Sequence, residues 1–114
     1  MKSPSDIKFH QASQVLEVCF SDKHYELSAE YLRQFSPSAE VRGHGAQEIT
    51  FLPGKSEVKI TQLAPVGQYA IRLVFDDGHN TGIYSWDHLV ELGENAETNW
   101  KKYCDQLEER QLSR

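Results

Sequence analysis

Hydrophobic and polar residues alternate in several short stretches before residue 85, and beyond it the apolar residues recur every three or four positions. Alternation with a period of two predicts strands with one buried face, and a period near 3.6 predicts an amphipathic helix. The alternating stretches hold Ile7 and Phe9, Leu16 to Phe20, Tyr25 and Leu27, Val58 and Ile60, Tyr69 to Phe75, and residues 81–84. The helical stretch puts Trp100, Tyr103, Cys104 and Leu107 on one face.

Residues that favour helix ends divide this pattern into elements. Ser28 is the expected N-cap of a short helix, which ends before Pro37 because the residue preceding a proline disfavours the α region. Ser85 is a second expected N-cap, and the helix that follows is predicted to stop at Gly93. A last helix is predicted from about residue 95 to residue 112.

These elements predict an α+β fold in a single domain that takes in residues 1–114. We expect a small antiparallel β-sheet core, largely a single sheet, with a short helix after the first strands and a C-terminal helix packed on it. Turns between strands are expected at residues 21–23 and at Pro65-Val66-Gly67.

Charge and composition narrow the classes of partner. The chain has 17 Asp and Glu against 12 Lys and Arg, a formal net charge of -5. Such a domain has no general attraction for phosphates, so we expect no nucleic-acid partner. No apolar run approaches the ~18 residues of a membrane span, so we expect no membrane partner. The two cysteines, Cys19 and Cys104, follow no apolar secretory segment, and we expect a cytoplasmic protein with buried, reduced thiols.

Groups that could carry chemistry are few and lack the spacing of established motifs. No two of the five histidines and two cysteines form a C-x-x-C or H-x-x-x-H pair, and no nucleophile elbow is present. His24 and Glu26 share a strand face and fit the H-x-E start of an iron-binding triad, but that motif is short. His79 is either a ligand or an exposed turn residue. Arg42-Gly43-His44-Gly45 is either a loop that approaches a ligand or a flexible connection.

Several segments together resemble the gamma-butyrobetaine hydroxylase-like N-terminal domain family over about residues 7–108. They are Leu32-Arg33, Ser36-Pro37-Ser38-Ala39-Glu40-Val41-Arg42-Gly43-His44-Gly45, Asp77-Gly78-His79, Gly82-Ile83-Tyr84-Ser85-Trp86 and Leu92-Gly93. Small stand-alone bacterial members of this family have no settled function. In other proteins the domain precedes an iron- and 2-oxoglutarate-dependent oxygenase domain, or accompanies a P-loop iron–sulfur scaffold protein.

The resemblance also bears on metal binding. In the carnitine-pathway hydroxylases, three cysteines and a histidine of this domain hold a structural zinc. The cysteine positions correspond to Ser36, Ser38 and Val41 here, and the histidine to His79. Serine and valine supply no thiolate, so the zinc of those relatives is expected to be absent. No cofactor is expected, with zinc or iron as the alternatives.

The resemblance implies a non-catalytic cytoplasmic accessory or interaction domain that binds a protein partner, and not an enzyme. The alternative is a metal-binding module that assists iron–sulfur or iron-enzyme maturation. The loop at residues 42–45 and the turn at residues 77–79 are expected on one side of the molecule. The expected binding surface comprises Arg42, His44, Asp77, His79, Tyr84 and Trp86.

Overall fold

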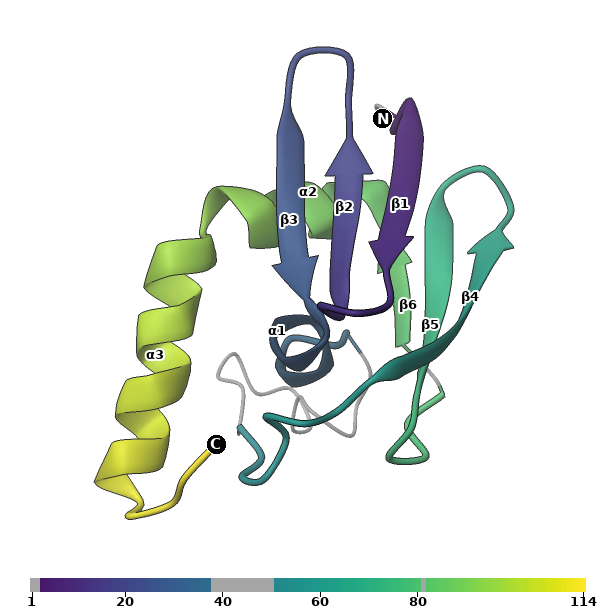
Figure 1. Ribbon diagram of the computed structural model, residues 1–114. Helices are drawn as coiled ribbons and strands as arrows, with labels where there is room; N and C mark the ends of the chain where they lie inside the picture. Colours follow the sequence, from purple (N-terminus) through teal and green to yellow (C-terminus); the bar gives the residue numbers. More distant parts are fainter. Residues whose placement is uncertain (1–2, 38–50, 81) are drawn as a thin grey trace.

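The computed structural model describes residues 3–37, 51–80 and 82–114, and it confirms the α+β fold (Figure 1). The strands are β1 (Asp6–His10), β2 (Val15–Cys19), β3 (His24–Ser28), β4 (Ile60–Val66), β5 (Ala70–Phe75) and β6 (Gly82–Ser85). The helices are α1 (Ala29–Gln34), α2 (Trp86–Glu94) and α3 (Ala96–Glu109). Among the described residues, no helix is long and apolar enough to span a membrane.

The strands form two antiparallel three-stranded sheets, and the expectation of a largely single sheet was wrong. The orders are β1-β2-β3 and β4-β5-β6, so each sheet consists of strands that are consecutive in the chain. The separation has a physical reason in the sequence. Helix α1 and a long connection lie between β3 and β4, whereas short turns connect the strands within each sheet.

The first sheet has one apolar and one polar face. In its register Leu16 lies opposite Phe9 and Leu27, and Val18 lies opposite Ile7 and Tyr25. Because successive side chains point to opposite faces, these residues share the face that packs into the core. Leu16 and Val18 are fully buried there. The other face of β2 carries alternating residues that include Glu17 and Cys19.

Gln14, in the turn between β1 and β2, connects the first sheet with its surroundings. Its carbonyl accepts a hydrogen bond from the amide of Ala29 at the start of α1 (2.9 Å). Its side-chain Oε1 accepts one from the amide of Ile60 at the start of β4 (2.9 Å). One turn residue therefore contacts both the first helix and the second sheet.

The second sheet corrects the turn expected at Pro65-Val66-Gly67. Strand β4 continues through Pro65 to Val66, with Pro65 opposite Ile71 and Val66 opposite Ala70. The reversal follows at residues 67–69 and begins with Gly67 at a φ of 54°. Proline is tolerated in β4 because this strand lies at the edge of its sheet, where an amide directed away from the neighbour can be missing.

Both expected N-caps are confirmed. The Ser28 hydroxyl accepts a hydrogen bond from the amide of Tyr31, and the Ser85 hydroxyl accepts one from the amide of His88, each at 3.1 Å. The expected stop at Gly93 was wrong, because α2 continues through Gly93 to Glu94. The glycine is needed there for a close approach by Tyr25 of β3 rather than for a helix end.

Helix α3 lies to one side of α1 (Figure 1). It reaches the core through side chains such as Tyr103, whose ring lies 5.3 Å from that of Phe51 between centroids. Tyr103 and Leu107 are buried, whereas Trp100 and Cys104 are only half-buried. The Tyr103 hydroxyl donates to the buried carboxylate of Glu30 on α1 (2.6 Å). Arg114 pairs with the same carboxylate through Nε and Nη2 (2.9 and 2.8 Å). The helix is therefore attached by both apolar packing and a shared buried carboxylate.

Candidate functional site

Ser36 and His79 meet in a buried polar contact. Ser36 follows α1 and is fully buried, and His79 lies in the turn after β5 and is 3% exposed. Their Oγ and Nε2 atoms are 2.9 Å apart. The resemblance implied that these two positions lie together, and the structure confirms it. Ser38 and Val41, the other two positions of the implied zinc set, lie outside the described residues.

Asp77 connects this turn with α1 through a partly buried ion network. One carboxylate oxygen accepts hydrogen bonds from Arg33 Nε and Lys55 Nζ, both at 2.8 Å. The other accepts from the amide of His79 (3.0 Å). Burial disfavours the charged carboxylate, but the bonds from Lys55, the His79 amide and Arg33 outweigh it and lower the pKa of Asp77 to about 2. The network fixes the turn against α1.

Tyr84 and Trp86 also have structural roles. Tyr84 is fully buried, and its hydroxyl donates to the carbonyl of Leu32 on α1 (2.5 Å). Trp86 is 7% exposed, and its indole Nε1 donates to the carbonyl of Gln68 (2.8 Å). When Tyr and Trp side chains are buried, their O–H or N–H group usually finds a hydrogen-bond acceptor, as both do here.

The binding surface expected from the sequence is therefore corrected. His79, Tyr84 and Trp86 are buried and cannot present their side chains to a partner. Asp77 remains near the surface but is bound to two cations. Arg42 and His44 lie outside the described residues, so the expectation that their loop faces the His79 turn stays a prediction.

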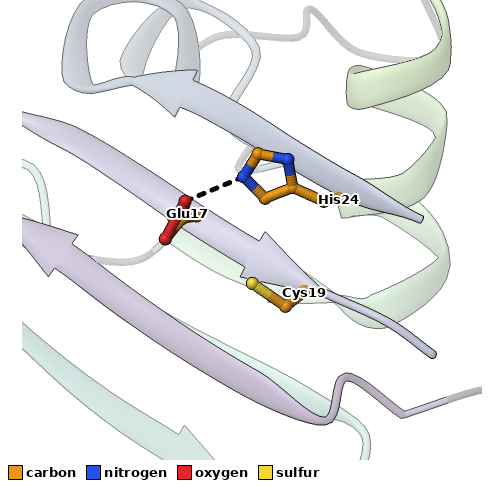
Figure 2. A group of neighbouring side chains, drawn as sticks. All are labelled: Glu17, Cys19 and His24. Atoms are coloured by element: carbon orange, nitrogen blue, oxygen red, sulfur yellow. Dashed lines mark hydrogen bonds and ion pairs between the residues drawn. The ribbon is translucent and has the colours of Figure 1, made fainter. Parts of the chain in front are cut away.

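A second group of polar side chains, which the sequence analysis did not bring together, lies on the outer face of the first sheet (Figure 2). It consists of Glu17 and Cys19 on β2 and His24 on β3. One potential ligand atom from each lies within 4.8 Å of the others. Glu17 Oε2 is 2.8 Å from His24 Nε2, and this hydrogen bond is the main cause of a lowered pKa of the Glu17 carboxyl.

Strand pairing explains why these three side chains meet. Cys19 lies directly opposite His24, and Glu17 is two residues before Cys19, on the same face. The H-x-E motif noted in the sequence contributes less than expected. His24 Nε2 is 4.0 Å from Glu26 Oε1, farther than from Glu17. The alternation and the turn at residues 21–23 were the signals that could have revealed the cross-strand pair.

A groove of about 600 Å³ lies between the end of the first sheet and α3. Its lining is mostly apolar and comprises Val15, Glu26, Ser28, Tyr31, Ala96, Glu97, Trp100, Lys101, Cys104 and Asp105. The rings of Tyr31 and Trp100 contact each other at 6.4 Å between centroids in an edge-on arrangement. The half-buried state of Trp100 and Cys104 follows from this groove, since both line it.

The chain is similar to known proteins in both sequence and structure. A family model described as gamma-butyrobetaine hydroxylase-like, N-terminal, matches residues 7–90. One similar solution NMR structure is 42% identical with a TM-score of 0.86, and the match covers 100% of this chain and 90% of that protein. A second is 41% identical with a TM-score of 0.84, covering 100% and 86% respectively.

A crystal structure from Acidithiobacillus ferrooxidans is also similar. It shows a protein of unknown function assigned to the DUF971 family, 38% identical with a TM-score of 0.66, covering 80% of this chain and 92% of that protein. No curated protein matches the sequence significantly. These similarities therefore establish the fold and an evolutionary relationship, and they assign no activity to this chain.

Proposed function

The chain belongs to the gamma-butyrobetaine hydroxylase-like N-terminal family, and from this premise we propose that it is a non-catalytic interaction domain that binds a segment of a protein partner. The observation that supports this proposal is the open, mostly apolar groove between the first sheet and α3. Concave apolar surface with a few polar groups at its margin is typical of binding sites.

The shape of the groove suits an apolar side chain. Tyr31 and Trp100 provide aromatic surface that is already held in place, because Trp100 also contacts the ring of Tyr103 (5.1 Å) and the guanidinium of Arg114 (5.1 Å). Rigid aromatic groups lose little conformational entropy on binding and are frequent in interaction sites. The groove is therefore prepared for an aliphatic or aromatic residue of the partner.

Charged side chains that line the groove determine which residues of the partner can flank the apolar residue. Among the described residues that line it, Glu26, Glu97 and Asp105 are acidic and Lys101 is basic, and Lys101 is paired with Asp105 at 2.7 Å. The remaining carboxylates favour a partner segment in which Lys or Arg flanks the apolar residue. A neutral small molecule would bind through the apolar part of the groove alone, and its affinity would not depend on these charges.

The two cysteines provide a matched pair of variants to test the groove. Cys104 lines it and Cys19 does not. Peptides selected from a random library on the wild-type domain are expected to share an apolar residue flanked by Lys or Arg. Attaching a bulky maleimide to Cys104 in the Cys19→Ser variant should abolish their binding. The same label on Cys19 in Cys104→Ser should leave binding at the level of the unlabelled Cys104→Ser variant.

A charge reversal supplies the second arm. Glu97→Lys should weaken peptide binding, whereas Glu109→Lys should not, because it makes the same change on the same helix outside the groove. Binding that survives the Cys104 label would refute the groove as the site. Binding that is lost equally in Glu109→Lys would show a general charge effect and refute the proposed specificity.

The alternative function, a metal-binding module that assists iron–sulfur or iron-enzyme maturation, has less support at the predicted position. There Ser36 supplies a hydroxyl to the imidazole of His79 where the relatives are expected to have a thiolate.

As part of the main proposal we place the domain in the cytoplasm, because Cys19 and Cys104 are both free.

A further inference from the structure

We propose that Glu17, Cys19 and His24 form a binding site for a divalent cation of the zinc class on the outer face of the first sheet. These residues differ from the positions that the resemblance assigns to zinc, and the proposal does not depend on the groove. It rests on the convergence of a carboxylate, a thiol and an imidazole from two paired strands (Figure 2).

The distances already approach those of a metal site. Zinc bonds of about 2.0–2.3 Å in a tetrahedral arrangement put the ligand atoms roughly 3.3–3.7 Å apart. Glu17 Oε2 and His24 Nε2 are at 2.8 Å, and no pair in the set of three exceeds 4.8 Å. Side-chain shifts of about 1 Å would bring every pair into that range. The cation would then take the place of the hydrogen bond between Glu17 and His24.

The strand backbone holds the ligands in place without a loop. Cys19 and His24 are directly opposite each other, and Glu17 and Glu26 form the neighbouring pair on the same face. Side chains opposite each other in antiparallel strands have Cβ atoms about 5 Å apart, a separation that a metal can bridge. The unbound site is therefore largely preorganised by the register.

Among the neighbouring groups on β1, one is a candidate fourth ligand and two others form an ion pair. His10 Nε2 on β1 is 3.6 Å from Glu17 Oε1, which makes it a candidate fourth ligand. Asp6 lies opposite Cys19 and Lys8 opposite Glu17 on the same face, and these two are themselves paired at 3.8 Å. A water molecule would take the fourth position if His10 does not.

The combination of thiolate, imidazole and carboxylate determines the class of ion. It suits Zn²⁺ and its spectroscopic substitute Co²⁺, whereas Mg²⁺ and Ca²⁺ prefer oxygen ligands alone. Binding releases the Cys19 thiol proton to solvent. Since the His24 side chain is 52% exposed, we expect a bound ion to exchange readily, so the isolated domain can be free of metal and still bind added ion.

Titration of the metal-free domain with Co²⁺ tests the proposal. We expect one Co²⁺ per chain and the ultraviolet charge-transfer absorption of a Co²⁺–thiolate bond, displaced by Zn²⁺. Cys19→Ser should lose that absorption, and Cys104→Ser, which removes the only other thiol, should keep it. His24→Ala and Glu17→Gln should each weaken Co²⁺ binding by about tenfold or more.

His79→Ala is the control for the position that the resemblance implies, and it should leave Co²⁺ binding unchanged. Absence of the charge-transfer band in the wild-type domain overturns the proposal. So does a band that persists in Cys19→Ser or disappears in Cys104→Ser. Circular dichroism of each variant confirms that the comparison is made between folded proteins.

Discussion

The backbone of Gly93 lies directly against the ring of Tyr25. A Cβ atom added at position 93 would be 2.5 Å from Cγ and 2.9 Å from Cε1 of that ring. The Tyr25 hydroxyl donates a hydrogen bond to the carboxylate of Glu94, the residue that ends α2. Helix α2 therefore packs on β3 at a separation that only glycine permits at this position.

Gly93→Ala should destabilise the domain by about 1–3 kcal/mol, because overpacking must displace the ring or the helix. Denaturant unfolding measures the change. In a Tyr25→Ala background the same substitution should lose its cost or become stabilising, since alanine favours the helix interior by about 1 kcal/mol over glycine. Equal destabilisation in both backgrounds would disprove the contact as the cause.

Asp77 should make stability depend on pH in the acid range. Its pKa of about 2 in the folded state lies below the ordinary value of 3.8. A lowered folded-state pKa stabilises the fold above the ordinary value, and that stabilisation is lost as pH falls through about 2. The expected contribution is about 2 kcal/mol.

Unfolding free energies measured from about pH 5 down to about pH 2 test this, with Asp77→Asn as the comparison. The variant should be less stable near neutral pH, because Arg33 and Lys55 lose their charged partner, and its profile should be flatter. Glu17 and Glu30 also have lowered pKa values, so some acid dependence remains in the variant. Parallel profiles would contradict the role of Asp77.

The contact between Ser36 and His79 predicts that a zinc site can be restored. The combined variant Ser36→Cys, Ser38→Cys and Val41→Cys should bind one zinc per chain, measured by metal analysis after gel filtration. Cys19→Ser is included in every variant to exclude the site on the first sheet. Adding His79→Ala should remove the zinc. A triple variant with no more zinc than its parent would show that the correspondence of these positions is wrong.

Trp100 and Tyr103 should differ in their contributions to stability. A fully buried Trp100 would cost about 3–5 kcal/mol on replacement by alanine. Because it is half-buried and lines the groove, we expect about 1–2 kcal/mol from the loss of its contacts with Tyr31 and Arg114. Tyr103→Ala should reach about 3–5 kcal/mol, since Tyr103 is fully buried. Equal losses in thermal or denaturant unfolding would contradict this difference.

Local chemistry made the helix starts and most strands predictable. Ser28 and Ser85 cap their helices because a serine hydroxyl can accept a hydrogen bond from an amide three residues later, wherever the helix packs. The period of two located the strands because each sheet has one face turned to the core. These signals depend on near neighbours in the chain, which a sequence displays directly.

The remaining features depend on contacts between distant residues. A glycine at position 93 is typical of a helix C-terminus, but its role here is set by Tyr25, which lies 68 positions earlier in the chain. His79 and Tyr84 looked suited to a surface site, and their burial depends on acceptors and donors supplied by Ser36 and Leu32. The group at Glu17 required the register between β2 and β3, which alternation alone does not determine.

Pro65 in the edge strand β4 has a consequence for how the domain behaves at high concentration. An exposed sheet edge with a complete row of amides is a template on which another chain can add a strand and begin aggregation. Proline has no amide hydrogen, so a strand added to β4 would lack a donor at that point in the ladder. Growth of the second sheet along β4 is therefore disfavoured, and replacing Pro65 would remove a safeguard against edge-to-edge association as well as alter a strand.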